Sequence, residues 1–207
     1  GLIEELHQEF PITVCYTDNM SQEATELAQL GIKTINTKTI KGLTQTIDLV
    51  STSRIVIADN YFAFLGDIHK QNKQEFFQLW HATGAIKQFG LEDKTVKNRT
   101  VADKNRFKRV YDSFDYYVVG SEKMADVFKR SYGATDNQMC YLGFPRTDYL
   151  VQQPKKEATT IKTIVYLPTY REGESESSAK EMLELMEQLG EGYELLIKTH
   201  PHVTLKH

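Results

Sequence analysis

The sequence has few cysteines and no long apolar run. Only two cysteines occur among its 207 residues, Cys15 and Cys140, and each lies in an apolar, strand-like stretch. This usage predicts reduced core residues of a cytoplasmic protein rather than a disulfide framework. No stretch approaches the roughly 20 apolar residues that a membrane-spanning helix needs, and no signal-peptide pattern opens the chain. We therefore expect any contact with a membrane to be peripheral.

The sequence also lacks a charge excess and several well-known enzyme motifs. Its formal net charge of −3 argues against a dedicated nucleic-acid binder. It contains no G-x-G-x-x-G, no G-x-x-x-x-G-K-[ST] and no G-x-S-x-G, so dinucleotide oxidoreductases, P-loop enzymes and nucleophile-elbow hydrolases lose their main support. Its composition, 40% hydrophobic and 26% charged, is that of an ordinary globular protein.

Strand-like and helix-like segments alternate along the chain. The predicted strands are 12–17, 32–36, 54–60, 76–80, 116–121 and 138–143, and the predicted helices are 22–31, 43–52 and 122–133. This alternation predicts an α/β fold in which helices cover both faces of a parallel sheet. We expect residues 1–150 to form a Rossmann-like domain.

A second unit is predicted after a polar stretch at 151–160, which we interpret as a linker. Strands at 163–169 and 193–200 flank a helix at 178–190, and these few elements cannot bury a core on their own. We therefore expect 161–207 to be the start of a second Rossmann-like domain, with the chain being a fragment of a longer protein.

The first stretch with chemistry is FFQLWHATGAIKQFG, which delivers His81 to a loop of small residues after an apolar strand. In open α/β sheets, ligands bind just past the carboxyl ends of the strands. An imidazole there can take a proton from a hydroxyl near neutral pH. Thr83 and Gly84 let a ligand approach the backbone, and Lys87 can neutralise a phosphate. The alternative is a histidine that only caps a tight loop.

Two further loops offer a cation at a strand end. Arg146, in GFPRTDYL, could hold a phosphate, but an internal pair with Asp148 is the favoured interpretation. Arg171, in LPTYRE, precedes a predicted helix, and a helix N-terminus with a nearby arginine suits a diphosphate. Thr169 belongs to the same loop. The alternative for Arg171 is a solvated acidic loop.

The last loop is KTHPH, at the end of the final predicted strand. His200 and His202 have the spacing of a metal-binding pair, but no carboxylate or cysteine accompanies them closely, so we predict no metal site. Contact of His200 and Lys198 with a phosphate is favoured over metal binding, and a purely structural His-Pro turn remains the alternative.

Residues 94–109 form a basic segment, with seven Lys or Arg against one acid. Its second half places apolar residues at helical spacing, which predicts one buried helix face: Phe107, Val110, Tyr111 and Phe114. Lys104 and Lys108 lie off that face. A run of charge is usually a solvated face, and the alternative is a surface for anionic lipid headgroups or a lipid diphosphate.

Taken in order, QLWHATGAIKQFG, GFPRTDYL, LPTYRE and KTHP resemble the CDP-glycerol glycerophosphotransferase family of Gram-positive wall teichoic acid synthesis. The Trp-His-Ala-Thr-Gly form of the first loop is more similar to the glycerol-phosphate primase branch than to the polymerase branch. The resemblance implies a GT-B fold, two Rossmann-like halves with the active site between them. It implies that His81 is the general base and that His200 is the family's His-Pro histidine. A later family block, with an aspartate and paired serines, has no counterpart in the chain.

The function expected from this resemblance is transfer of glycerol phosphate from CDP-glycerol to an undecaprenyl-diphosphate-linked ManNAc-GlcNAc disaccharide, with release of CMP. It places the protein peripherally on the cytoplasmic face of the membrane. The donor-side candidates are Thr169, Arg171 and Lys198, and the acceptor or phosphate candidates are Thr83, Gly84, Lys87 and Arg146. No cofactor is firmly implied, and the need for a divalent cation stays open. The alternatives are a chain-extending transferase, another GT-B nucleotide-sugar enzyme, or a non-catalytic module that binds the lipid carrier.

Overall fold

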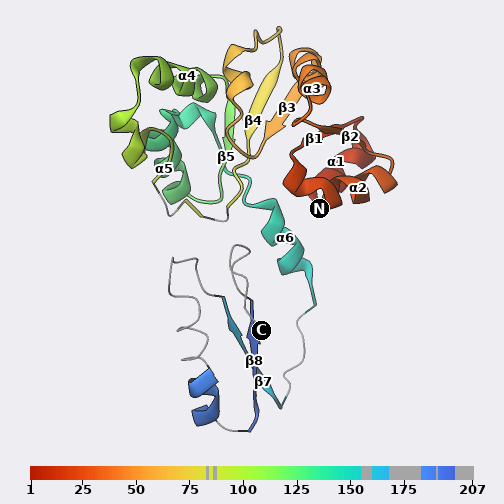
Figure 1. The fold of residues 1–207 in the computed structure, drawn as a ribbon, viewed down its shortest axis with the longest axis vertical. Helices are drawn as coiled ribbons and strands as arrows, with labels where there is room; N and C mark the ends of the chain where they lie inside the picture. The colour runs from red at the N-terminus through yellow and green to blue at the C-terminus, as the bar shows by residue number, and fades with distance from the viewer. Residues whose placement is uncertain (83, 86–87, 155–159, 168–182, 190, 199–207) are drawn as a thin grey trace. The chain divides into compact units, whose positions relative to one another are not determined.

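A computed structural model describes residues 1–82, 84–85, 88–154, 160–167, 183–189 and 191–198, with the backbone alone at Arg146 and Tyr149. The chain divides into two compact units, Gly1–Gln153 and Pro154–His207, coloured red to teal and blue in Figure 1. None of the helices within these described residues is long and apolar enough to cross a bilayer.

The first unit is built on parallel strands. Its strands are β1 (Thr13–Tyr16), β2 (Lys33–Asn36), β3 (Ile55–Ala58), β4 (Glu75–Gln78), β5 (Tyr116–Val118) and β6 (Met139–Cys140). Strands β1 and β2 form one parallel pair, and the other four form a parallel sheet in the order β3-β4-β5-β6. The predicted α/β class with parallel sheets is therefore confirmed.

Helices alternate with most of these strands, as the pattern predicts, and one further helix lies at each end of the unit. They are α1 (Leu2–Glu9), α2 (Ser21–Gln29), α3 (Ile40–Thr52), α4 (Val101–Asp112), α5 (Glu122–Tyr132) and α6 (Pro145–Gln152). Local signals set the ends of α5, because Ser121 Oγ accepts the Met124 N–H and Gly133 follows the helix at φ +72°. Helices α1 and α6 were not predicted. Helix α6 also extends two residues into the stretch that we interpreted as a linker.

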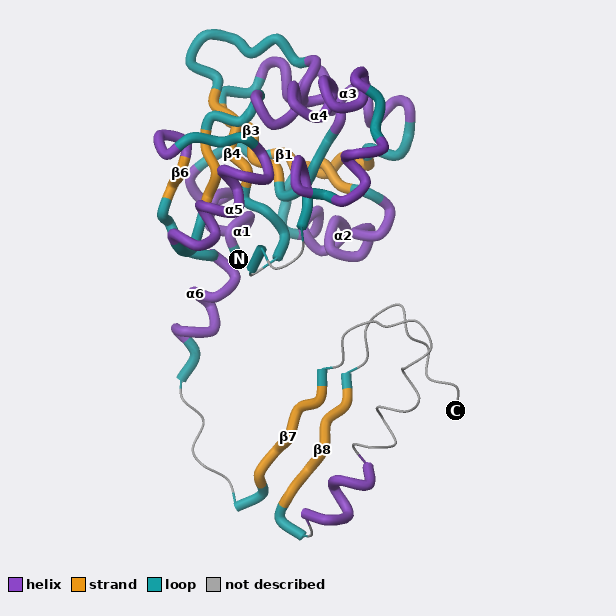
Figure 2. Tube along the Cα trace, turned by 90° about the vertical axis from the view of Figure 1, so that its left-hand side faces the viewer, coloured by secondary structure: helices purple, strands orange, loops and turns teal. Residues whose placement is uncertain are grey.

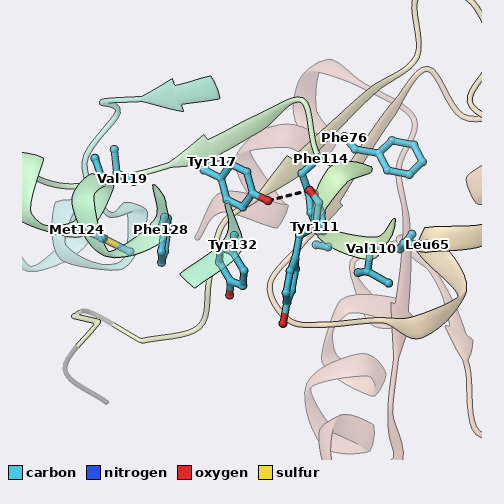
Figure 3. Packing of buried hydrophobic residues seen from close by; sticks show 12 residues of the cluster. Leu65, Phe76, Val110, Tyr111, Phe114, Tyr117, Val119, Met124, Phe128 and Tyr132 are labelled. Carbon is cyan, nitrogen blue, oxygen red and sulfur yellow. Dashed lines mark hydrogen bonds between the residues drawn. The ribbon is translucent and has the colours of Figure 1, made fainter. Parts of the chain in front are cut away.

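The core of this unit lies among β4, β5, α4 and α5 (Figure 3). Phe76, Val110 and Phe128 have no exposed side-chain surface. The helical face predicted in the basic segment is confirmed for Val110 and Tyr111, which are buried, and for Phe107, which packs against the cluster. Phe114 is also buried, but it lies after the end of α4. The prediction for the cysteines was wrong in part: both are free thiols, but Cys15 is exposed and Cys140 is only partly buried.

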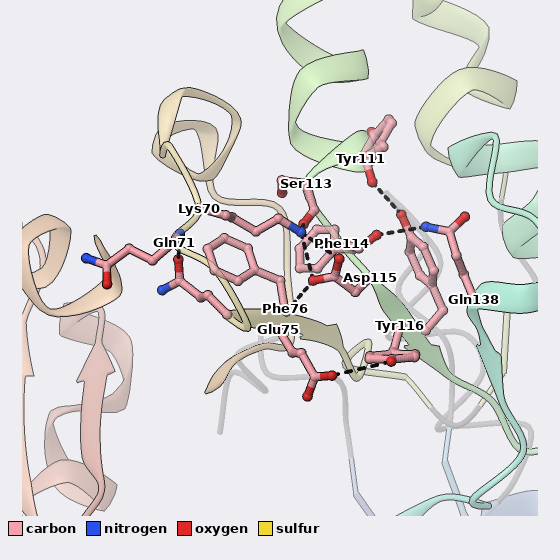
Figure 4. Close-up of polar contacts among 12 residues, drawn as sticks. Lys70, Gln71, Glu75, Phe76, Tyr111, Ser113, Phe114, Asp115, Tyr116 and Gln138 are labelled. Carbon is pink, nitrogen blue, oxygen red and sulfur yellow. Dashed lines mark hydrogen bonds and ion pairs between the residues drawn. The ribbon is translucent and has the colours of Figure 1, made fainter. Parts of the chain in front are cut away.

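A polar network closes the amino ends of β4 and β5 (Figure 4). Lys70 Nζ lies 2.7 Å from both carboxylate oxygens of Asp115 and donates to the Ser113 carbonyl at 3.0 Å. Asp115 Oδ2 also accepts the backbone N–H of Phe76 at 2.8 Å. These contacts tie the two strands together at the edge opposite to the one where ligands are expected.

The second unit contains two parallel strands, β7 (Lys162–Tyr166) and β8 (Tyr193–Ile197), which lie side by side in Figure 2. Residues 183–189 are helical. Val165 and Leu196 keep about half of their surface exposed, 56% and 49%, so the described residues leave these strands incompletely covered. The assignment of this second unit to an incomplete Rossmann-like domain stays a prediction.

Candidate active site

The loop after β4 reverses direction at Trp80. This residue has a φ of +64°, a left-handed conformation that is uncommon for a bulky side chain. Its backbone N–H donates to Gln78 Oε1 at 2.9 Å. Its indole ring packs against two others, with centroid distances of 4.3 Å to Phe89 and 4.1 Å to His81. Packing and hydrogen bonding thus hold a backbone turn that brings His81 back toward β3.

His81 is exposed, and one of its nitrogens is fixed. Nδ1 lies 3.1 Å from the carbonyl oxygen of Asp59, in the loop that follows β3. Because a carbonyl oxygen only accepts hydrogen bonds, Nδ1 must carry the proton in this contact. In the neutral imidazole, Nε2 then keeps its lone pair, which is the form that a general base needs. The same contact also ties two loops together, so His81 has a structural role whether or not it is the base.

A cavity of about 440 Å³ lies at the carboxyl ends of β4, β5 and β6. Three strand-end loops and the first turns of α5 and α6 form its wall. The lining residues are Gly84, Ala85, Gly120, Ser121, Lys123, Met124, Val127, Gly143, Phe144 and Thr147. The first loop is the one that carries His81, although His81 itself does not line the cavity.

Glycines bring the loops after β5 and β6 close together. A Cβ atom on Gly120 would lie 3.8 Å from the carbonyl carbon of Gly143, and Gly143 has a φ of +81°, which favours glycine. Helix α5 begins at this point, and the free N–H groups of a helix N-terminus favour an anionic ligand. The lining residue Lys123 adds a positive charge. The cavity is therefore suited to a small ligand that carries a phosphate.

The predicted acceptor-side residues fall in or near this wall where they are described. Gly84 lines the cavity. Arg146 lies on α6, with its side chain undescribed, and Thr83 and Lys87 lie outside the described residues. Sequence reasoning missed Ser121 and Lys123, although a strand followed by Gly-Ser and a helical pattern was the available signal. No group of three or more His, Cys, Asp or Glu side chains that could hold a metal gathers within the described ranges.

Of the predicted donor-side residues, the structure describes Lys198 alone. It follows β8 directly, its side chain is exposed, and its backbone N–H donates to the Tyr166 carbonyl at 3.1 Å. Thr169, Arg171 and His200 lie outside the described residues. Their roles stay predictions.

The basic segment carries fewer free charges than its sequence indicates. Arg106, Lys108 and Arg109 form ion pairs with Asp103 at 3.0 Å, Asp112 at 2.6 Å and Asp67 at 3.2 Å, respectively.

Two other basic residues of this segment differ in their contacts. Arg99 lies over the ring of Phe107, with its guanidinium carbon 4.1 Å from the centroid. Lys104 is exposed and forms no ion pair with any described residue. The two predicted membrane-facing lysines therefore differ, because Lys108 is already neutralised by Asp112.

Comparisons with known proteins agree with the resemblance seen in the motifs. Residues 2–207 match the family described as CDP-glycerol:poly(glycerophosphate) glycerophosphotransferase. The chain is 36% identical over 214 residues to a teichoic acid glycerol-phosphate primase of Bacillus subtilis (strain 168), covering 98% of this chain and 56% of that protein. It is 35% identical to one of Staphylococcus aureus (strain NCTC 8325 / PS 47), covering 80% and 47%. It thus spans about half the length of these relatives.

Similarity to polymerases is weaker. A teichoic acid poly(glycerol phosphate) polymerase of Staphylococcus epidermidis is 24% identical over 64% of the chain. Among solved structures, a variant of the wall teichoic acid polymerase TagF has a TM-score of 0.71 at 17% identity, covering 99% of this chain and 54% of that chain. Another TagF variant, soaked with CDPG, has a TM-score of 0.69 at 16% identity and covers 96% and 52%. At this identity the likeness shows the fold alone.

Proposed function

The chain belongs to the CDP-glycerol:poly(glycerophosphate) glycerophosphotransferase family, within its glycerol-phosphate primase branch, and we propose that it acts as a primase. The reaction moves glycerol phosphate from CDP-glycerol to a polyprenyl-diphosphate-linked ManNAc-GlcNAc disaccharide and releases CMP. The observation that carries this proposal is an exposed His81 whose Nδ1 is fixed by Asp59, on a strand-end loop that also lines a cavity.

In the proposed reaction, His81 Nε2 takes the proton of the attacking acceptor hydroxyl. The hydroxyl oxygen forms a bond to the phosphorus that carries glycerol, and the bond from that phosphorus to the bridging oxygen breaks. CMP leaves with the bridging oxygen and the electron pair of that bond. Negative charge grows on the leaving phosphate, and nearby cations stabilise it. By the family resemblance, Arg171 and His200 of the second unit supply this stabilisation, in a GT-B arrangement of two Rossmann-like halves.

The cavity of the first unit is the proposed acceptor site. The polar part of its wall, Ser121 and Lys123 at the start of α5, suits a sugar or phosphate group of the acceptor. Gly84 leaves room for close approach. Thr83, Lys87 and Arg146 are proposed to contact the same acceptor, and Thr169 and Lys198 to contact the donor.

A lipid-linked acceptor requires the enzyme to reach the membrane. We propose peripheral attachment at the cytoplasmic face, through the exposed side of the basic segment 94–109. The support is that Lys94, Lys97 and Lys104 have no ion-pair partner among the described residues. The apolar face with Val110 and Tyr111 is buried in the core, so attachment is electrostatic rather than by insertion of this face.

The decisive experiment is an assay of the full-length protein with CDP-glycerol and a short-chain lipid acceptor analogue. CMP should be released only when both are present, and a UDP-sugar should not replace the donor. Absence of CMP with every such acceptor would contradict the proposed reaction, and turnover of a UDP-sugar would indicate a different GT-B enzyme.

The proposed base is tested in the same assay. His81→Ala should lower kcat by about 10²- to 10⁴-fold, the usual contribution of a positioned base. The matched control is His69→Ala, because His69 is also exposed but precedes β4 at the opposite edge of the sheet. It should keep its kcat. A folded His81→Ala protein with normal kcat would remove His81 from the mechanism.

A further inference from the structure

We propose that Gln78 is a positioning residue for His81, a role that rests on the proposed function of His81 as the base. Gln78 is the last residue of β4 and is 2% exposed. A buried amide with a hydrogen-bonding partner at each end is better explained by a structural demand on the neighbouring loops than by packing alone. The loops that it joins are the two that fix His81.

The amide of Gln78 connects the loops after β3 and β4. Its Nε2 donates to the carbonyl oxygen of Asn60 at 3.2 Å, and its Oε1 accepts the backbone N–H of Trp80 at 2.9 Å. Asn60 follows Asp59, whose carbonyl receives His81 Nδ1, and Trp80 precedes His81. The Gln78 side chain thus holds Asn60 and Trp80, the residues next to Asp59 and His81.

Loss of this amide would release both loops at once. The Trp80 N–H would lose its acceptor at a residue that already holds a left-handed backbone, and the Asn60 carbonyl would lose its donor. The Asp59 carbonyl would then no longer be fixed opposite His81. Without that acceptor, the proton is free to move from Nδ1 to Nε2, which blocks the lone pair that the reaction needs. The expected defect therefore concerns the tautomer and the position of His81.

The chain offers a matched control four residues earlier. Gln74 is also buried, at 7% exposure, and also joins loops through its amide. Its Nε2 donates to the carbonyls of Val50 and Ser53 at 2.6 and 2.5 Å, and its Oε1 accepts the Gln71 N–H at 3.1 Å. It lies at the amino end of β4, away from His81. Gln74→Met therefore removes a similar set of bonds without touching the site.

The test compares Gln78→Met with Gln74→Met in the full-length protein. Gln78→Met should lower kcat about 10- to 100-fold, because small misplacements of a catalytic group have effects of this size. Its KM for CDP-glycerol should stay within about twofold, since no donor contact is removed. Gln74→Met should lose stability and keep its kcat. Equal losses of kcat in the two variants, or none in Gln78→Met, would overturn the proposal.

A second readout does not depend on the reaction. In protein with ¹⁵N-labelled histidine, the His81 signal, identified by its absence in His81→Ala, should report a protonated Nδ1. This signature should be lost in Gln78→Met and kept in Gln74→Met. Retention in Gln78→Met would overturn the proposal even if His81 proves catalytic. Conversely, a His81→Ala variant with normal kcat would contradict the assignment of His81 as the base. The ¹⁵N signature of His81 in Gln78→Met would then still decide whether Gln78 positions His81.

If Gln78→Met does not fold, Gln78→Glu provides the same test. The test is made at a pH high enough to ionise the introduced carboxyl group, because burial beside a carbonyl oxygen favours its protonated form. The carboxylate can then still accept the Trp80 N–H, but its second oxygen faces the Asn60 carbonyl without a proton to donate. The loop after β3 is then released while the loop after β4 is held. We expect the same loss of the Nδ1–H signature and a lower kcat at that pH. An unchanged signature and an unchanged kcat would overturn the proposal.

Discussion

Removal of the Asp115 carboxylate should destabilise the first unit far more than removal of a surface acid nearby. Asp115 accepts the Lys70 ammonium at 2.7 Å and the N–H of Phe76 at 2.8 Å. Phe76 is fully buried, so the lost partner cannot be replaced easily by water. Asp112 is the matched control, because it pairs with Lys108 at 2.6 Å on α4 but both side chains are more than half exposed.

The magnitudes follow from these surroundings. An orphaned buried N–H costs about 1–3 kcal/mol, and a hydrogen bond to a charged group contributes about 1.5–3 kcal/mol. The Lys70–Asp115 pair is partly exposed, at 27% and 34%, so its share lies at the low end. Asp115→Ala should therefore lower the free energy of unfolding by about 2–4 kcal/mol. Asp112→Ala should lower it by about 0.5 kcal/mol or less.

Urea unfolding followed by tryptophan fluorescence measures both effects, because the chain's one tryptophan, Trp80, lies in the first unit. Asp115→Asn separates the two contributions: its amide oxygen still accepts the Phe76 N–H, so only the interaction with Lys70 is weakened, and the cost should fall to about half. The reasoning is refuted if Asp115→Ala costs no more than Asp112→Ala, or if Asp115→Asn is as damaging as Asp115→Ala.

Three further predictions concern pH, the donor and the membrane. Burial raises the pKa of Tyr111 to about 12, so the folded state holds a proton that the unfolded state releases near pH 10. Stability should therefore fall as pH rises from 10 to 12, by up to about 3 kcal/mol from this group, and urea unfolding of Tyr111→Phe should show a shallower fall. Arg171→Ala should weaken CDP-glycerol binding about 10-fold or more, and unchanged affinity in calorimetry would contradict a donor contact. Binding to anionic vesicles should fall steeply with salt and fall further in Lys104→Glu than in Lys108→Glu; insensitivity to both would make the basic segment a solvated face.

Much of the fold was predictable because its signals are local. Helix α5 has its cap at Ser121 and its glycine at Gly133, and the face that α4 turns to the core follows from Phe107, Val110 and Tyr111 at helical spacing. Helix α6 was not predicted, although Pro145 occupies the first turn of this helix, where its missing N–H costs nothing. Short α1 offered only a brief amphipathic pattern at the start of the chain.

Two of the three loops around the cavity were predicted as strand-end sites, those that carry His81 and Arg146, and the loop at Gly120 was not. His81 was found because a histidine, small residues and a lysine follow one another in sequence after a strand. The rest of the cavity wall comes from Gly120, Gly143 and their neighbours, which reach Gly84 only through the strand order β4-β5-β6. Nothing in the local pattern gives that order. The left-handed turn at Trp80 was also hidden, since positive φ is expected at glycine and not at tryptophan.

At both ends of β4, side chains accept backbone N–H groups that the neighbouring strand does not pair. Glu75 and Leu79 donate their N–H groups to β3, at the carbonyls of Arg54 and Ala58. Strand β5 pairs with β4 at only two positions, Phe77 and Gln78. The N–H groups of Phe76 and Trp80, on the side of β4 that faces β5, therefore have no backbone partner in β5.

Side chains replace the missing strand at both points: the Asp115 carboxylate accepts the Phe76 N–H, and the Gln78 amide accepts the Trp80 N–H. The first replacement fixes the start of the strand. The Gln78 contact lies where the pairing of β4 with β5 ends, and it holds the residue just before His81. In the proposed role, the Gln78 amide links the sheet to the position of the proposed base, together with the ring packing of Trp80 and the His81–Asp59 contact.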